Sequence, residues 1–213
     1  PLVMNPAKPP RELNRLDSKN WHPTPQPLQE QLAGAVGGLA RKVDAIIVLD
    51  QVDEPETGVV TQNLLHAIND IRDQTLIIGD SRRGLKGWPD IIYKMNMDEL
   101  TRLTGKPGKQ AKEASSQLAK ETGQPVFVSL AHDGIIGADP VGEVEHRPAL
   151  PAQGEIDIVG AGDAVMANLT TALSCGAQIG EALELANAAA SVVIHKLGTT
   201  GTAATSEIRA KLD

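Results

Sequence analysis

The stretch Asp157–Asp163 combines residue types that could move a phosphoryl group. It reads Asp-Ile-Val-Gly-Ala-Gly-Asp and leads directly into a run with helical periodicity. Amides at a helix N-terminus lack intrahelical partners and carry the positive end of the helix dipole, so they can bind a phosphate. A carboxylate in the same turn would repel that phosphate unless it takes a proton from an attacking hydroxyl. The pattern therefore indicates phosphoryl transfer, with Asp163 as the proton acceptor.

The same glycines also have a purely structural interpretation. Gly160 and Gly162 could simply allow a tight loop into the helix, as glycine pairs often do. A G-x-G-x-x-G dinucleotide fingerprint fits less well, because Val165 stands at the position of its third glycine. The sequence has no G-x-x-x-x-G-K-[ST] loop, which argues against a P-loop kinase.

A second set of oxygen ligands lies near the middle of the chain. Asn96 follows the predicted strand 91–95, and Glu99 comes three residues later in a predicted helix. This spacing is that of a capping box, which would only stabilise the helix. Amide and carboxylate oxygens are also ligands that Mg²⁺ accepts alongside several waters. Asp50 and Asp80 end two further predicted strands, so a parallel sheet would bring these groups to one edge.

The rest of the chain alternates short apolar runs with segments of helical period, which is typical of buried strands and covering helices. Strands are predicted at 43–50, 75–79, 91–95 and 126–130, with a hairpin-like pair at 135–136 and 143–146. Helices are predicted at 29–41, 58–71, 97–103, 109–122, 163–174 and 181–197. The proline-rich first thirty residues are predicted to be extended or irregular. This order predicts an α/β fold with a mostly parallel central sheet and helices on both faces.

Spacing within the helices predicts which side chains are buried. Val165, Met166 and Leu169 share one face of the helix after Asp163, and that helix is expected to end at a left-handed cap on Gly176. In the predicted helix 58–71, Val59 is expected to face inward, and Cys175 is expected to pack on the apolar side of its helix.

Composition limits the function. The 213 residues suffice for a single α/β domain over 1–213, and the lone cysteine excludes an internal disulfide framework. A net charge of −7 and a pI near 5.2 argue against a surface for nucleic acid or anionic membrane. No apolar run approaches the ~20 residues that span a bilayer. The expected location is the cytoplasm.

The stretch Asp157–Asp163 resembles the D-T-x-G-A-G-D signature of the ribokinase-like (PfkB) carbohydrate kinases, with Ile158 in place of the usual threonine. The resemblance implies a three-layer ribokinase-like fold and ATP-dependent phosphorylation of a sugar or sugar-phosphate hydroxyl. It also implies that Asp163 is the catalytic base. The amides of Gly160, Ala161 and Gly162 would then stabilise the charge that develops on the transferred group.

Other parts of the chain resemble the family's metal and nucleotide motifs. Asn96 and Glu99 match N-x-x-E, which helps to organise Mg²⁺ through water. The segment 128–134 resembles V-T-x-G-x-x-G, although Ala131 replaces a glycine. The implied nucleotide contacts are Ser129, Gly134, Asn187, Gly198 and Gly201. Without the resemblance, 128–134 is a strand ending in a turn, in which His132 is a solvated residue, and Asn187 lies in a closely packed helix.

The substrate side is less defined by the sequence. Arg15-Leu16-Asp17 together with Asp80-Ser81-Arg82-Arg83 most resembles the heptose-phosphate kinase branch. Asp50, Arg82 and Asp157 are the candidate substrate contacts, and an arginine here could meet a phosphate. An exposed basic turn would give the same pattern at 82–83.

The resemblance covers about 11–201 but matches only the later part of a typical family member. The usual N-terminal sugar-contacting and lid portion is not found, so the chain is expected to be the C-terminal portion of a kinase. Two alternatives stay open: a nucleotide-binding module without turnover, and a nucleoside or vitamin kinase of the same superfamily. A homodimer is possible, because lid strands often form the dimer contact in this family.

Overall fold

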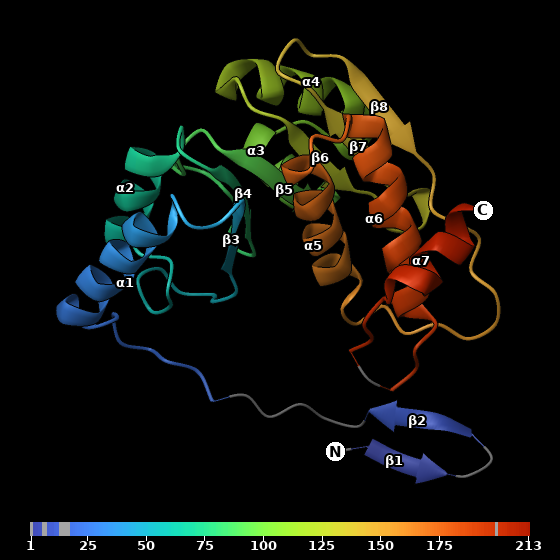
Figure 1. The fold of residues 1–213 in the computed structure, drawn as a ribbon. Helices are drawn as coiled ribbons and strands as arrows, with labels where there is room; N and C mark the ends of the chain where they lie inside the picture. The colour runs from blue at the N-terminus through green and yellow to red at the C-terminus, as the bar shows by residue number, and fades with distance from the viewer. Residues whose placement is uncertain (1, 6–7, 13–17, 199) are drawn as a thin grey trace.

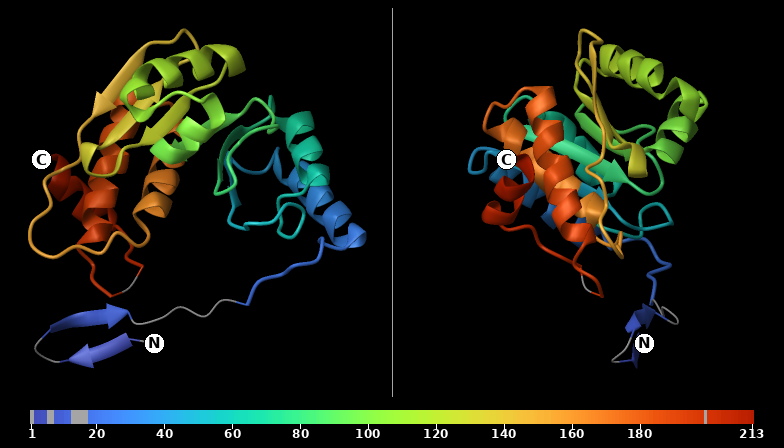
Figure 2. Two further views of the ribbon diagram at one scale, coloured as in Figure 1. Left: turned by 180° about the vertical axis from the view of Figure 1, so that it is seen from behind. Right: turned by 90° about the vertical axis from the view of Figure 1, so that its right-hand side faces the viewer.

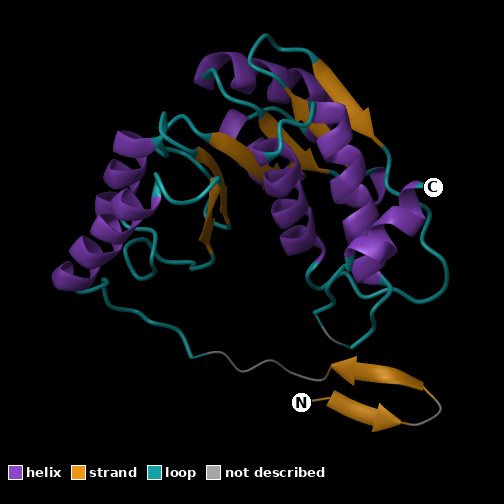
Figure 3. Ribbon diagram, viewed as in Figure 1, coloured by secondary structure: helices purple, strands orange, loops and turns teal. Residues whose placement is uncertain are grey.

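The computed structural model describes residues 2–5, 8–12, 18–198 and 200–213. The chain begins with an antiparallel hairpin of β1 (Leu2–Asn5) and β2 (Lys8–Glu12), which lies apart from the main sheet (Figures 1 and 3). The Arg15–Asp17 part of the predicted substrate motif falls outside the described residues.

The core of the fold is a six-stranded sheet with the strands in chain order. Its strands are β3 (Ala45–Asp50), β4 (Leu76–Ser81), β5 (Ile92–Asn96), β6 (Val126–Ser129), β7 (Ile135–Ala138) and β8 (Val144–Arg147). The first four run parallel to one another. β7 is antiparallel to β6, and β8 is antiparallel to β7. The predicted mostly parallel sheet and the hairpin-like final pair are therefore confirmed.

Helices cover both faces of this sheet, which gives the three predicted layers (Figure 2). They are α1 (Gln26–Leu39), α2 (Gln62–Ile71), α3 (Met97–Thr104), α4 (Ala111–Thr122), α5 (Ala161–Ser174), α6 (Ile179–Ile194) and α7 (Thr205–Leu212), with short 3-10 turns at Gly108–Gln110 and Ala131–Asp133. None of the helices in the described residues is long and apolar enough to cross a membrane.

The two cores follow from the alternation of side chains along each strand. Ile77 of β4 joins the core under α1–α4, whereas its neighbour Ile78 joins the core under α5 and α6. Val126 and Phe127 of β6 divide in the same way. The predicted buried face of α5 is confirmed, because Val165, Met166 and Leu169 lie in the second core.

Three local predictions are wrong. The second predicted helix begins at Gln62 rather than 58, because the Thr61 side chain caps it by accepting the amide of Leu64. Val59 therefore precedes the helix and is 55% exposed instead of facing inward. Cys175 is exposed at the end of α5 and not packed, whereas Gly176 adopts the expected left-handed conformation with φ +82°.

Helix boundaries at the chain ends also differ from the prediction. α1 starts at Gln26, within the segment predicted to be irregular, because Pro27 falls in its first turn, where proline is tolerated. α7 was not predicted, since Ile208 is its only buried side chain and its position depends on contact with Ala188 and Ala189 of α6.

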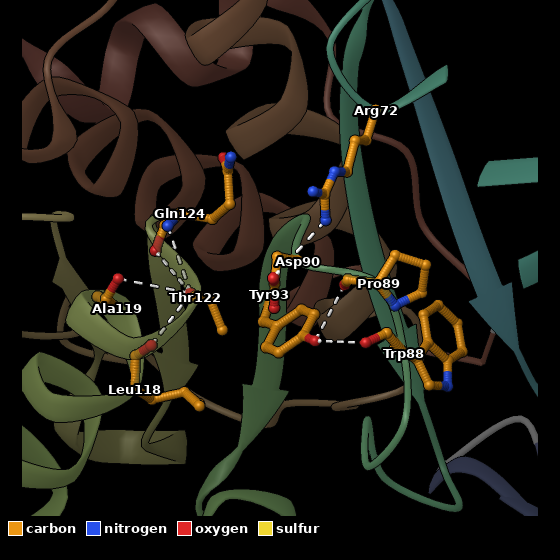
Figure 4. A network of polar contacts seen from close by, with 9 residues as sticks. All are labelled: Arg72, Trp88, Pro89, Asp90, Tyr93, Leu118, Ala119, Thr122 and Gln124. Atoms are coloured by element: carbon orange, nitrogen blue, oxygen red, sulfur yellow. Dashed lines mark hydrogen bonds and ion pairs between the residues drawn. The ribbon is translucent and has the colours of Figure 1, made fainter. Parts of the chain in front are cut away.

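A polar network lies at the amino ends of β4–β6, which form the edge of the sheet opposite the predicted ligand edge. A cavity of about 320 Å³ lies here between Arg72, Asp90 and Gln124. Beside it, the Tyr93 hydroxyl donates to the carbonyl oxygens of Trp88 and Pro89, at 3.2 and 3.0 Å (Figure 4). Burial, with a smaller effect of the charge on Asp90, raises the pKa of Tyr93 from 10.0 to about 12.

Tyr93 is the only tyrosine of the chain, so its ionisation can be followed directly. We expect an ultraviolet phenolate titration of the folded protein to give a pKa near 12, and that of the unfolded protein a pKa near 10.0. The folded state favours the neutral phenol over the phenolate. The contribution of the Tyr93 side chain to stability is therefore intact below pH 10 and is lost as the pH rises towards 12. A folded-state pKa near 10 would contradict the buried position, and Tyr93→Phe should abolish the signal.

Candidate active site

The predicted anion-binding turn opens α5 at the carboxyl edge of the sheet. Gly160 is the N-cap with φ +85°, and a Cβ there would lie 2.7 Å from Cγ2 of Thr200. Glycine is therefore required at this position for both its backbone conformation and its space. The Ala161 amide donates to the Ile158 carbonyl at 3.2 Å, which closes the turn.

The first turn of α5 leaves other amides for a ligand. Gly162 and Asp163 follow Ala161 in the helix, where amides have no intrahelical acceptor. Among the described residues, and apart from its own helix backbone, a Cβ built on Gly162 would meet only Nζ of Lys94 within 4 Å, at 3.8 Å. Asp163 is exposed, so its carboxylate does not face the hydrophobic core. The Ala161 amide, in contrast with the prediction, is already used by the turn.

Asp157 joins this turn to the end of α6. Its amide donates to the Ile194 carbonyl at 2.8 Å. Its two carboxylate oxygens accept the amides of Val159, at 3.0 Å, and Gly198, at 3.4 Å. The carboxylate predicted to contact substrate therefore holds two loops together in this structure. Ile158, which replaces the family's threonine, is 74% exposed.

A buried ion pair that the sequence did not reveal lies next to α5. Lys94 of β5 donates to Asp80 of β4 at 2.7 Å, and their side chains are 7% and 17% exposed. Strand alternation places Lys94 on the α5 face, because Tyr93 and Met95 beside it join the opposite core. A lysine inside an apolar strand was the available signal, since lysine is rarely buried without a partner.

Asn96 and Glu99 form the predicted capping box at the start of α3. The Asn96 side chain accepts the Glu99 amide at 2.9 Å, and the Glu99 carboxylate accepts the Asn96 amide at 2.7 Å. Burial raises the pKa of the Glu99 carboxyl, the bond from Asn96 opposes this effect, and the charge on Asp80 adds to it. The pair therefore caps α3, and these two hydrogen bonds leave oxygen lone pairs of both side chains unused.

The oxygen groups at this edge fit Mg²⁺ only as a partly hydrated ion. Among the described residues, no group of three or more His, Cys, Asp or Glu side chains could hold a metal ion by itself. Magnesium usually keeps several waters and binds one or two carboxylates together with substrate phosphates. Asn96 and Glu99 are suitable oxygen ligands for such water-mediated contact.

The predicted nucleotide contacts on β6 and α6 occupy two places. Ser129 is the register partner of Asn96 at the ends of β6 and β5, and its hydroxyl donates to the Met95 carbonyl at 3.3 Å. Gly134 has φ +93°, and a Cβ there would lie 2.1 Å from the Arg147 carbonyl oxygen. The side-chain amide of Asn187 donates to that same oxygen at 3.0 Å. Gly134 and Asn187 thus meet at the segment that leaves β8.

The last predicted turn lies beside the anion-binding turn. The Gly198 amide reaches Asp157, and a Cβ on Gly201 would lie 2.9 Å from Cβ of Lys196. Lys196 also pairs with Glu207 of α7 at 2.8 Å, which ties this turn to the last helix. The structure therefore groups 157–163 with Gly198 and residues 200–201.

Asp50, a predicted substrate contact, lies at the end of β3 and is 1% exposed. Its Oδ2 accepts hydrogen bonds from Arg83 at 2.6 Å and from the Ser81 hydroxyl at 2.9 Å. The carboxylate is thus engaged within the chain, whereas the neighbouring Arg82 is exposed. His132 is exposed, as expected for a solvated turn residue.

Residues 29–206 match the family described as pfkB family carbohydrate kinase. The chain belongs to this family. It is 31% identical over 211 residues to the bifunctional protein HldE of Hyphomonas neptunium and 29% identical over 199 residues to that of Paramagnetospirillum magneticum. The matches cover 94% and 89% of this chain but only 42% and 39% of the HldE proteins.

The fold of this pfkB family member is that of the ribokinases. The Arabidopsis thaliana ribokinase complexed with ribose and ATP superposes with a TM-score of 0.68 at 21% identity. The superposition covers 83% of this chain and 58% of the ribokinase. The ribokinase-like α/β fold predicted from the sequence is therefore confirmed.

Gly160 and Gly162 differ in what they require, which a pair of substitutions can test. We expect Gly160→Ala to lower the melting temperature clearly, because its φ of +85° and the 2.7 Å approach to Thr200 leave no room for a methyl group. Gly162→Ala should leave it unchanged or raise it slightly, because alanine favours helix and meets only Lys94 Nζ, at 3.8 Å. Equal losses in thermal unfolding of the two variants would contradict this assignment.

Proposed function

We propose that this chain carries the phosphoryl-transfer site of an ATP-dependent kinase that acts on a hydroxyl of a sugar or sugar phosphate. The observation that carries the proposal is the start of α5. There an exposed Asp163 and the first-turn amides share one helix end, with the buried ammonium of Lys94 next to Gly162. Membership of the pfkB carbohydrate kinases supports the same chemistry.

The proposed reaction is an in-line transfer. Asp163 accepts the proton of the substrate hydroxyl, whose oxygen forms a bond to the γ-phosphorus of ATP. The bond between that phosphorus and the bridging oxygen breaks, and ADP leaves with the bonding electrons. The amides of Gly162 and Asp163 stabilise charge on the equatorial oxygens, which is the main task of the protein in phosphoryl transfer.

The metal and nucleotide are assigned to the groups around this turn. Mg²⁺, held through water near Asn96 and Glu99, would neutralise phosphate charge during transfer. Ser129 at the same edge would face the phosphates. The segment where Gly134 and Asn187 meet, together with the Gly198–Gly201 turn, is the proposed nucleotide side.

The substrate is proposed to be a sugar phosphate, because Asp80-Ser81-Arg82-Arg83 resembles the heptose-phosphate kinase branch. Arg82 is exposed at the edge and is the proposed phosphate contact. Asp50 and Asp157 stay weaker candidates, since both carboxylates are engaged within the chain. A homodimer and a cytoplasmic location stay predictions.

Asp163→Asn tests the base directly. We expect turnover to fall by about 10²–10⁴-fold, because a general base contributes roughly that factor. Affinity for ATP should stay broadly intact, since the carboxylate acts on the acceptor hydroxyl. The measurement is ADP formation with a panel of sugars and sugar phosphates, alongside calorimetric ATP binding.

A matched control for this substitution is Asp70→Asn, which removes an exposed carboxylate from α2 on the opposite face of the sheet. It should change neither quantity. Unchanged turnover in Asp163→Asn would remove this residue from the mechanism. ATP binding by the unmodified chain without consumption on any acceptor would favour a nucleotide-binding module, and turnover confined to nucleosides or vitamins would favour the other branch of the superfamily.

A further inference from the structure

Lys94 is a charged side chain in a position where the fold would normally place an apolar one. It lies in the middle of the sheet on β5, between β4 and β6, and its side chain is 7% exposed. Ile92, two residues earlier on the same strand face, belongs to the core under α5 and α6. Burying an ammonium at such a position is costly unless a partner compensates. A need other than packing is therefore expected here.

Asp80 compensates this charge but does not use all of the hydrogen-bond donors of the Lys94 ammonium. A lysine ammonium has three donors. Among the described residues, the hydrogen bond to Asp80 Oδ2 at 2.7 Å is the one that the Lys94 ammonium makes. Its nitrogen lies 3.8 Å from the Cβ position of Gly162, so it is next to the open first turn of α5. The remaining donors are thus available on the side of that turn.

The location of the ammonium is electrostatically unusual. The N-terminus of α5 is the positive end of a helix dipole, and an ammonium next to it is repelled. Two positive groups from different layers of the fold therefore face one small region. Asp80 pairs with Lys94 directly, the charge on Lys94 also acts on Glu99, and the exposed Asp163 lies in the first turn of α5. An anionic group placed between the two positive groups would interact favourably with both.

Gly162 provides an independent indication that this region is left open. Its backbone is helical, without a positive φ, and a Cβ would meet only Lys94 at an ordinary contact distance. Neither conformation nor packing within the described chain requires glycine there, in contrast to Gly160. The absence of a side chain instead keeps the space in front of Lys94 accessible.

We propose that Lys94 binds the phosphoryl group that is transferred, from the sheet side, opposite the amides at the start of α5. This assignment rests on the proposed kinase function and adds a phosphate-binding residue to it. The ammonium contacts oxygens of the terminal phosphate of ATP, so it distinguishes ATP from ADP. Asp80 balances the ammonium when no phosphate is present.

The test compares the affinities for ADP and for the β,γ-imido analogue of ATP, measured by calorimetry at fixed Mg²⁺. In Lys94→Met, we expect the affinity for the ATP analogue to fall about tenfold or more relative to that for ADP, because a charge-assisted hydrogen bond is lost. Lys94→Arg should recover part of the preference. Lys112→Met, at an exposed position on α4, should not change it.

A second variant separates binding from folding. Lys94→Met leaves Asp80 buried without its partner and could unfold the protein. The double variant Lys94→Met/Asp80→Asn removes both charges and should show the same selective loss for the ATP analogue. An unchanged ratio of the two affinities in this folded double variant would overturn the assignment of Lys94 and leave the kinase proposal intact. Failure of the unmodified chain to bind either nucleotide would overturn both.

Discussion

The interaction on which the proposed site depends is the balance of charge between the sheet and the start of α5. The buried Lys94 and the positive end of the helix dipole approach each other from different layers, and Asp80 is the carboxylate that balances them. In a low-dielectric interior such charges interact strongly, so their separation must be well defined. The packing of α5 on β3 and on the second hydrophobic core fixes that separation. The proposed phosphate-binding site, in a chain of net charge −7, would thus obtain positive potential locally.

The parallel part of the sheet brings groups that are distant in sequence to a common edge. Asp50, Asp80, Asn96 and Ser129 lie at or near the carboxyl ends of four neighbouring strands. β7 runs back from this edge and β8 returns to it, so Arg147 at the end of β8 pairs with Ile135, the register partner of Ser129. Asp157 binds amides of both loops around α5 and α6, so the glycine turn is held by the end of the last long helix.

Much of this arrangement could be predicted from the sequence because the determining interactions are local. Apolar runs located the strands, and the spacing of Asn96 and Glu99 gave the capping box that starts α3. Gly160 was recognisable because its turn requires a positive φ. The boundary of α2 was missed, although Thr61 is a local cap that could have been recognised. α7 could not be found locally, since its position depends on contact with α6.

The sequence alone determined the α/β class, the glycine turn with its aspartate, and the edge of the sheet at which the candidate residues lie, because strand period, helix capping and glycine conformation act over a few neighbouring residues. Only the tertiary structure decided which charges meet. Asp80 and Lys94 are separated by a crossover, and Asp50 is engaged by Arg83 through a similar return of the chain. Such pairs form when packing of the layers sets distance and burial, and no local pattern encodes either quantity.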